Sequence, residues 1–218
     1  MTGYGQFCAI ARALEVVGER WTLLIIRELL LAPMRFGDLR ARLDDISPAL
    51  LTDRLNALME AGVVQRAVLP APFNAQVYEL TETGRAIQPA IRELIRWGGR
   101  FLFPMRKGET FEPDWVLLAL EAIARRTAVP QCRIGLRIPH PSGMAGFIIE
   151  GGPEGTRIAK GESSGIAAIE ARFDSLLQIL GRHLPLDEAI ASGAARIEGS
   201  AQTLRKLPNL FELATARR

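Results

Sequence analysis

Apolar residues recur at helical spacing in four segments near the start of the chain. The pattern predicts helices at residues 8–17, 21–31, 36–43 and 48–61. At the start of the fourth segment, Ser47 is a preferred N-cap and Pro48 suits the first helical position, where its missing N–H costs nothing. Leu51, Leu55 and Leu58 then follow at i, i+4 and i+7, so we expect them to bury one face of this helix.

After Gly62, a typical residue for ending a helix, the spacing changes to short extended runs. Two such runs, at residues 63–69 and 77–80, are separated by a turn with prolines and Asn74. Thr81 is a good N-cap for a long helix predicted at residues 82–103. Helices followed by a hairpin in this order are the layout of a winged helix-turn-helix, which indicates DNA binding rather than a catalytic cleft.

The second half of the chain mixes strand and helix patterns. Residues 133–138 alternate strictly between apolar and polar or small side chains, which predicts a strand. Further strands are predicted at 144–150, 156–160, 166–172 and 194–198, and helices at 115–126, 173–183, 186–191 and 201–211. Pro104 and Pro113, with a glycine and charges between them, mark residues 105–113 as a linker. We therefore expect an α+β protein with two domains, at residues 1–104 and 114–218.

Composition narrows the possible functions. The net charge is only +3 over 218 residues, so binding to nucleic acid would need a local basic patch. Without an apolar run long enough to span a membrane or a signal-peptide pattern, we expect a cytoplasmic protein with no membrane partner. Two cysteines and two histidines make no usual zinc site, so neither a metal nor a cofactor is expected. The sequence has neither a nucleophile elbow nor a phosphate-binding loop, so we expect no catalytic residues and no enzyme.

Residues 1–104 resemble the HxlR family of bacterial winged-helix transcription regulators. The resemblance is carried by CAIARAL at 8–14, GERWTLL at 18–24, RFGDL at 35–39, ISPALL at 46–51, LMEAGV at 58–63 and YELTETGR at 78–85. It implies a homodimer formed through the first helix and the long helix after the hairpin. It also implies a recognition helix that starts at Pro48 and enters the major groove, with wings beside it. Two departures are Ala9, where the family often has proline, and an uncharged wing at residues 70–76.

The recognition helix offers a small set of residues for reading bases. With the leucines inward, a rotation of about 100° per residue turns Ala49, Thr52, Asp53 and Asn56 outward. Asn56 could pair with adenine, Thr52 could meet a thymine methyl or a phosphate, and Asp53 could accept from cytosine or reject wrong sequences. Ser47, at the start of the helix, completes this set. The alternative is an ordinary solvated polar face.

Arginines near this helix are candidates for phosphate contacts. Arg35 and Arg66 have few acids close to them in sequence and are the first choices; Arg54 is also included, with Arg40 and Arg42 as further candidates. Since Asp38, Asp44 and Asp45 are near in sequence, some arginines could instead form surface ion pairs of small energy.

Cys8 lies at the start of the first predicted helix. A helix N-terminus lowers the pKa of a thiol, and Arg12 follows one turn later. In the family, this cysteine is a redox or electrophile sensor in some members. The alternative is a small, inert cysteine. At the other end of this domain, Trp97, Phe101 and Phe103 are expected to serve as anchors of the dimer interface.

Residues 114–213 resemble the sterol-carrier-protein-2-like fold, in which helices cover a sheet. The matching segments are FDSLLQIL at 173–180, LDEAIASG at 186–193 and ARIEG at 195–199. The resemblance implies an apolar cavity that binds sterols, acyl chains or other hydrophobic molecules. The residues predicted to line it are Leu136, Phe147, Ile149, Leu177, Leu180 and Phe211. A filled core uses the same residue types, so both interpretations remain open.

Together these patterns predict a homodimeric transcription regulator that binds double-stranded DNA at an inverted-repeat operator. In the first hypothesis, an apolar small molecule in the second domain changes its affinity for the operator. One alternative is a redox- or electrophile-sensing regulator that acts through Cys8. Another is a lipid carrier in which DNA binding is vestigial.

Overall fold

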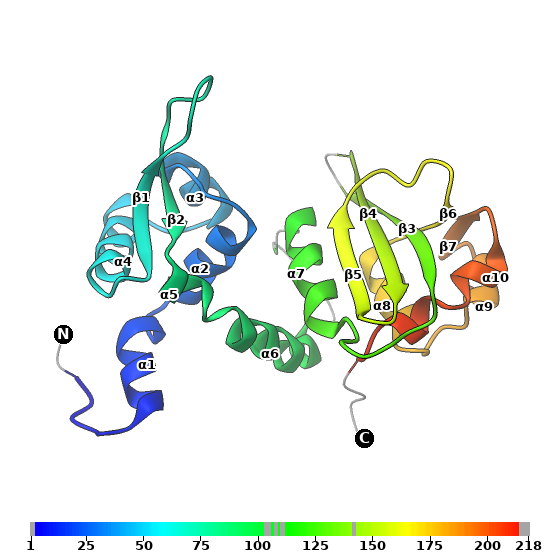
Figure 1. Cartoon of the computed structure of the whole chain (residues 1–218), viewed down its shortest axis with the longest axis horizontal. Helices are drawn as coiled ribbons and strands as arrows, with labels where there is room; N and C mark the ends of the chain where they lie inside the picture. Colours follow the sequence, from blue (N-terminus) through cyan, green and yellow to red (C-terminus); the bar gives the residue numbers. More distant parts are fainter. Residues whose placement is uncertain (1–2, 103–105, 107–108, 110–111, 141–142, 214–218) are drawn as a thin grey trace. The chain divides into compact units, whose positions relative to one another are not determined.

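The computed structural model describes residues 3–102, 106, 109, 112–140 and 143–213 (Figure 1). Internal contacts group the chain into two compact units, Met1–Ile91 and Arg92–Arg218, and each is described by itself. Most of the predicted linker at 105–113, and Phe103 before it, lie outside the described residues. The domain boundaries predicted from sequence therefore stay predictions.

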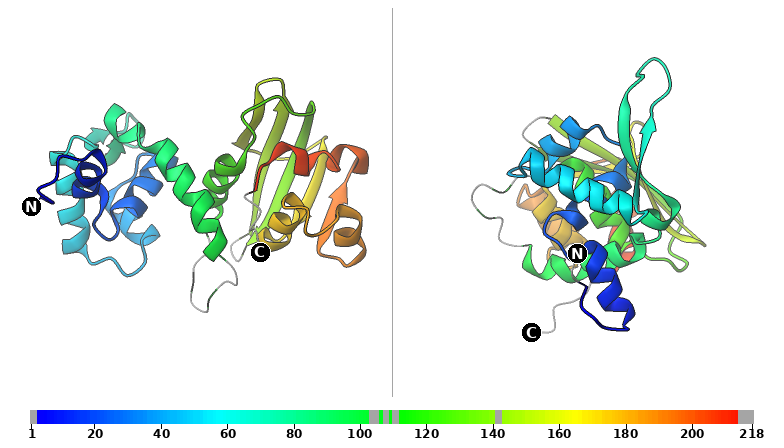
Figure 2. Two further views of the ribbon diagram at one scale, coloured as in Figure 1. Left: turned by 90° about the horizontal axis from the view of Figure 1, so that it is seen from below. Right: turned by 90° about the vertical axis from the view of Figure 1, so that its left-hand side faces the viewer.

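The first unit has the predicted order of helices followed by a hairpin. Its elements are α1 (Ala9–Val17), α2 (Thr22–Leu31), α3 (Phe36–Arg42), α4 (Pro48–Glu60), β1 (Val64–Val68), β2 (Gln76–Leu80) and α5 (Glu82–Arg85). Helix α4 begins as predicted, because the Ser47 side chain accepts a hydrogen bond from the Leu50 N–H at 3.2 Å. Strands β1 and β2 form an antiparallel hairpin that extends beyond the helices (Figure 2). We call this hairpin the wing.

One hydrophobic core holds the helices and the wing together. Leu51, Leu55 and Leu58 of α4 are buried, as their spacing predicts. They pack in one cluster with Ile25, Ile26 and Leu29 of α2, Leu39 of α3, Val64 of β1 and Leu80 of β2. The backbones of Met34 and Tyr78 exchange two hydrogen bonds, of 3.0 and 2.8 Å, which join the segment before α3 to β2.

Thr81 joins the end of α4 to the end of the wing. Its hydroxyl donates to the Gly62 carbonyl at 2.6 Å, and its backbone N–H donates to the Val63 carbonyl at 3.0 Å. The same hydroxyl accepts from the Gly84 N–H at 3.1 Å and caps α5. A Cβ at Gly84 would lie 2.1 Å from the Val63 oxygen, so only glycine fits there. This junction fixes the wing to the helix that precedes it.

The single helix predicted at residues 82–103 is wrong. The structure has α5, then α6 (Gln88–Gly98) and a 3-10 turn at Gly99–Phe101, with a turn at residues 86 and 87. Pro89 explains the break, because it has no N–H to donate to an earlier turn and it disfavours helical geometry just before it. Proline is well placed within the first turn of the new helix.

The described strands of the second unit form one mixed sheet in the order β5-β4-β3-β6-β7. Their bounds are β3 (Cys132–His140), β4 (Gly143–Gly152), β5 (Gly155–Lys160), β6 (Ala167–Ala171) and β7 (Ala195–Glu198). Only β3 and β6 pair in parallel. The helices are α7 (Pro113–Ile123), α8 (Phe173–Leu180), α9 (Leu186–Ala191) and α10 (Ala201–Leu204), with a 3-10 turn at Leu207–Leu210. The helix predicted at 201–211 is therefore wrong in its second half, where Pro208 prevents an α-helix from continuing.

The helices cover one face of this sheet. Ile134, Leu136 and Ile138, alternate residues of β3, lie in a buried cluster with side chains from α7, α8, α10 and the last 3-10 turn. Arg133 and Arg137 occupy the other face, where they pair with Glu150 at 3.3 Å and Glu198 at 2.7 Å. The prediction of a sheet covered by helices is confirmed.

The residues predicted to line a ligand cavity all belong to the packed core under these helices. Five of them are buried, namely Leu136, Phe147, Ile149, Leu180 and Phe211, and Leu177 packs against them. A pocket at the surface of the second unit is lined by other residues, which are Arg133, Gly165, Ile166, Ala167, Glu198, Gly199, Ser200 and Thr203. This arrangement fits the filled core that the sequence left open as the alternative.

Candidate nucleic-acid interface

Helix α4 presents the outward face that its periodicity predicts. Ala49, Thr52, Asp53 and Asn56 are all exposed. The Thr52 hydroxyl donates to the Pro48 carbonyl at 2.9 Å, so its hydrogen is used within the helix, while its methyl group and lone pairs face outward. The Asn56 amide can offer a donor and an acceptor side by side, the arrangement that recognises the major-groove edge of adenine.

The N-terminus of α4 contributes a further polar group. Ser47 is exposed, and its oxygen is already an acceptor for the Leu50 N–H. Its hydroxyl hydrogen remains able to donate to an anion. Phosphate contacts at a helix N-terminus use such groups together with the first backbone N–H groups.

Arg54, which was predicted to contact DNA, also makes contacts within the protein. Its guanidinium lies 2.8 Å from a Glu19 carboxylate oxygen and donates to the Arg20 carbonyl at 3.3 Å. These contacts join α4 to the segment between α1 and α2. Arg54 therefore helps to position α4, and its contact with phosphate stays a prediction.

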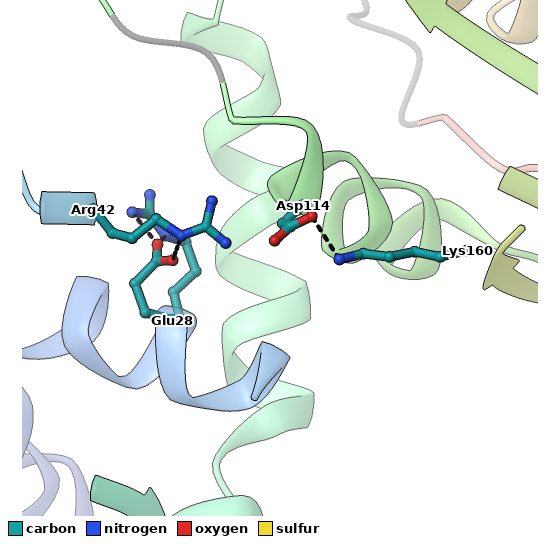
Figure 3. A network of polar contacts seen from close by, with 5 residues as sticks. Glu28, Arg42, Asp114 and Lys160 are labelled. Atoms are coloured by element: carbon teal, nitrogen blue, oxygen red, sulfur yellow. Dashed lines mark hydrogen bonds and ion pairs between the residues drawn. The ribbon is translucent and has the colours of Figure 1, made fainter. Parts of the chain in front are cut away.

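A buried carboxylate removes one arginine from the phosphate candidates. Glu28 of α2 has 0% exposure; one of its oxygens lies 2.6 Å from Arg27, and the other lies 3.5 Å from the Arg42 Nε atom (Figure 3). The figure also draws Lys160 and Asp114 of the second unit, which form an ion pair at 2.5 Å. Because a buried carboxylate needs such partners, Arg42 joins α3 to α2 and is not available as a free cation.

The role of Glu28 was not predicted from the sequence. The available signal was an acid within the apolar run TLLIIRELLL of α2, at a position where the helix faces the core. A charge in such a place needs a partner of opposite sign. The segment RFGDLRAR that follows supplied several candidates, but the sequence does not say which arginine reaches it.

Three of the five arginines considered as phosphate candidates remain exposed cations. Arg35, Arg40 and Arg66 are exposed, and within the described part of the chain none of them makes an ion pair. Arg66 lies on β1 with its guanidinium carbon 5.8 Å from the centre of the Tyr78 ring, a distance that suits a cation–π contact. The ring restrains the guanidinium while leaving its N–H groups free for phosphate.

Cys8 is exposed and occupies the N-cap position of α1, where its side chain makes no capping hydrogen bond. The arginine expected to assist it is turned elsewhere, since Arg12 lies 3.0 Å from Glu15. That guanidinium, together with the Tyr4 N–H, holds the pKa of the Glu15 carboxyl below its usual value. In the second unit, burial raises the pKa of the Cys132 thiol.

Two helices carry exposed apolar side chains at helical spacing. On α1 and just before it these are Phe7, Ile10 and Leu14. On α6 and the turn after it they are Leu94, Trp97 and Phe101, and the last two rings meet edge to face with their centres 5.1 Å apart. Large apolar side chains at this spacing on a helix surface are typical of a protein–protein interface.

Other kinds of site find little support. Among the described residues, no group of histidine, cysteine and acidic side chains is arranged to hold a metal ion. None of the described helices has the length and apolar character needed to cross a membrane. The features above instead define a winged helix-turn-helix whose α4 face and wing are open.

Comparison with known proteins agrees with this class. The family described as HxlR-like helix-turn-helix matches residues 16–106. An uncharacterized HTH-type transcriptional regulator of Mycobacterium tuberculosis is 43% identical over 94 residues, which are 43% of this chain and 59% of that protein. YodB of Bacillus subtilis is 36% identical over 92 residues, which are 42% of this chain and 82% of YodB. The chain belongs to the HxlR-like helix-turn-helix family.

Solved structures of related proteins match the same part of the chain. The reduced form of YodB has 33% identity and a TM-score of 0.39, and covers 46% of this chain and 100% of its own. The redox regulator HypR in its oxidized form has 28% identity and a TM-score of 0.40, with coverages of 43% and 96%. The chain spans 59% of the mycobacterial relative, and the family match ends at residue 106. The resemblance of residues 114–213 to a sterol-carrier domain stays a prediction.

Proposed function

We propose that this protein is a homodimeric transcription regulator that binds double-stranded DNA at an inverted-repeat operator. The observation that carries the proposal is the open polar face of α4, capped by Ser47, within a helix-turn-helix of the HxlR-like family. A helix of this kind lies in the major groove and reads base edges with its outward side chains.

Different residues contact the bases and the phosphates. Thr52 and Asn56 read bases, while Asp53 accepts from cytosine or disfavours other sequences. Ser47 and the backbone near Ala49 meet a phosphate at the helix N-terminus. Arg35 and Arg66 supply charge-assisted phosphate contacts, which set the register but carry no sequence information.

The dimer forms through the exposed apolar side chains of α1 and α6. Trp97 is 60% exposed in the single chain although it is among the largest apolar side chains. Tryptophan is enriched among the residues that dominate binding energy at interfaces. A second copy of the chain would cover Trp97 and Phe101 and would bring two recognition helices to two half-sites.

The defining experiment measures binding of the full chain to duplexes selected from a random-sequence library, at several salt concentrations. Asn56→Ala should weaken discrimination at one base pair by about 1–3 kcal/mol. Arg66→Ala should weaken binding to all sequences and reduce the salt slope by about 1. The matched control is Gln202→Ala, an exposed amide on α10. Binding by the parent chain that is indifferent to both sequence and salt would exclude the proposal.

A second candidate concerns the input signal rather than DNA binding. Solved structures of the relative YodB include a quinone-bound and a diamide-treated form, and Cys8 of this chain is exposed at a helix N-terminus. We infer that Cys8 is the site where electrophiles act. Its sulfur adds to a quinone ring carbon and forms one S–C bond. The thiol proton and the displaced ring proton end on the two oxygens, which gives a hydroquinone thioether.

This candidate is favoured over an apolar effector. A sterol or acyl chain among Leu136, Phe147 and Phe211 would have to displace side chains that already fill the core. To test it, the full chain and Cys8→Ser are treated with benzoquinone, followed by intact-mass measurement and DNA binding. The candidate is supported if the adduct mass shift appears, and DNA binding is lost, only where Cys8 is present. An unchanged response in Cys8→Ser, or saturable binding of a fluorescent fatty acid, would favour the other hypotheses.

A further inference from the structure

The end of the wing is apolar and exposed. The segment from Val68 to Ala75, which we call the wing tip, contains no charged residue. Val68 and Phe73 are each 67% exposed. In a domain whose core is already closed, large apolar side chains at the end of a projecting hairpin contribute little to folding (Figure 1).

The wing tip is held in one conformation by its own hydrogen bonds. The Leu69 N–H donates to the Ala75 carbonyl at 2.9 Å, which closes the loop at its base. The Phe73 and Asn74 N–H groups both point to the Pro70 carbonyl, at 3.1 and 3.4 Å. Proline at two positions restricts the loop further. Phe73 is therefore presented outward before any partner is bound, so little additional ordering is needed on binding.

The wing tip follows directly after the part of β1 that carries the exposed cation Arg66. Alternate residues of a strand share a face, so Arg66 and Val68 of β1 point to the same side of the wing. If Arg66 contacts a phosphate, the apolar wing tip lies against the same duplex, beside that phosphate. Because the wing tip has no cation, it cannot form an ion pair with a phosphate. Because it has no carboxylate, the phosphates do not repel it. Its chemistry suits the floor of a groove and the faces of the bases.

We propose that the wing tip enters the minor groove and that Phe73 wedges between two stacked base pairs; this inference rests on the DNA-binding function proposed above. Phenylalanine and proline are among the side chains that open base steps in this way and bend the duplex. The exposed amide of Asn74 then donates to the acceptors that adenine and thymine present in the minor groove. The wing thus reads how easily a base step opens, while α4 reads base edges.

Flexible steps such as TA open at the lowest energy, so the wedge favours such a step on the flank of each half-site. The Phe73 contact involves no phosphate. Replacing Phe73 should therefore change affinity and the stacking of that step without changing the salt dependence. These expectations separate Phe73 from Arg66 on the same hairpin.

The experiment uses the full chain and a duplex selected from a random-sequence library. 2-Aminopurine is placed at successive positions across the flank, and its fluorescence rises where a base loses its stacking partner. The variants are Phe73→Ser, which removes the wedge, and Phe73→Leu, which keeps an apolar one. The matched control is Met144→Ser, an exposed apolar side chain of the second unit. Sedimentation of each variant without DNA reports the oligomeric state.

We expect the parent chain to raise the fluorescence at one step of the flank. Phe73→Ser should abolish that signal and weaken binding about tenfold with the salt slope unchanged, and Phe73→Leu should keep most of both. Met144→Ser should behave like the parent chain.

Three results would overturn the inference. In the first, Phe73→Ser binds the duplex and raises the fluorescence as the parent chain does. In the second, it weakens binding to selected and random duplexes equally and lowers the salt slope, which is the behaviour of a backbone contact. In the third, it shifts the oligomeric state, which makes a second copy of the chain the partner of the tip. If the parent chain binds no duplex in a sequence- or salt-dependent way, the proposed DNA-binding function itself fails.

Discussion

Two sets of apolar side chains in this protein each line one face of their elements, at strand spacing in one set and at helical spacing in the other, and they have opposite environments. Those on the inner face of the second unit's sheet, such as Phe147 at 1% exposure, are packed by helices. Those on α1 and α6, such as Leu14 and Trp97, are open in the single chain. In the sequence, both sets form apolar faces, and the resemblance to a dimeric family pointed to an interface only for α1 and the end of α6. The comparison teaches that periodicity identifies an apolar face but does not say what covers it.

The first set is covered within one chain, while the proposed partner of the second set is another copy of the chain. A core substitution should therefore change the stability of the folded chain at any concentration. A substitution in the open set should change association and leave the folded chain nearly as stable. Three predictions test this division and a fourth concerns an ion pair on α1; they are given from the largest expected effect to the smallest.

Phe147→Ala should lower the free energy of unfolding by about 3–5 kcal/mol, because it leaves a hole in a packed core. Denaturant unfolding followed by circular dichroism measures this. The control is Met144→Ala, an exposed side chain on the same strand, for which little change is expected. A loss below about 1 kcal/mol for Phe147→Ala would mean that the side chain borders open space, as the cavity hypothesis requires.

Trp97→Ala should weaken the dimer by about 2 kcal/mol or more, because a buried aromatic anchor at an interface is lost. Sedimentation over a range of concentrations gives the dissociation constant. The unfolding midpoint at low concentration should stay close to that of the parent chain. Arg100→Ala, an exposed neighbour beyond α6, is the control. An unchanged dissociation constant for Trp97→Ala would remove α6 from the interface.

Leu14→Ala should weaken the dimer by about 1 kcal/mol, since part of this side chain is already buried in the single chain. Leu24→Ala is a matched control, because the two leucines are 42% and 40% exposed and lie on different helices. Equal effects of the two substitutions on dimerisation would show that α1 has no special part in the interface.

The smallest effect is expected at the pair of Arg12 and Glu15. The pKa of Glu15 is lowered from its ordinary value of 4.5. The ionised Glu15 carboxylate therefore contributes to the stability of the folded state at pH values above 4.5. This contribution is lost as the pH falls through the lowered value, when the carboxyl is protonated and releases Arg12 and the Tyr4 N–H. The protection of the Tyr4 amide, which is its hydrogen exchange rate compared with that of an unstructured peptide at the same pH, should then fall on acidification. In Glu15→Gln this protection should be low at every pH; the same pH response in that variant would refute the assignment.

Sequence reasoning was most successful where one residue fixes local geometry. Ser47 with Pro48 placed the start of α4, and three leucines placed its buried face. The two wrong helices also have local causes, since Pro89 and Pro208 interrupt patterns that otherwise look continuous. A stricter use of proline as a boundary would have found both breaks.

The candidate site was predicted only in outline. The outward residues of α4 follow from periodicity, whereas the pairing of Arg54 with Glu19 and of Arg42 with Glu28 depends on contacts between elements. The choice between a cavity and a filled core depends on the distance between helices and sheet. That distance is set by tertiary packing and is not encoded in the residue types of Leu136 or Phe147.

The junction at Thr81 has a consequence for the kinetics of recognition. It links the last turn of the recognition helix, the exit of the wing and α5 through one side chain and one glycine without room for a Cβ. A reading surface fixed in this way meets DNA without a slow rearrangement. Association rates should therefore vary little among operator sequences, and the dwell time on each sequence should carry the selectivity.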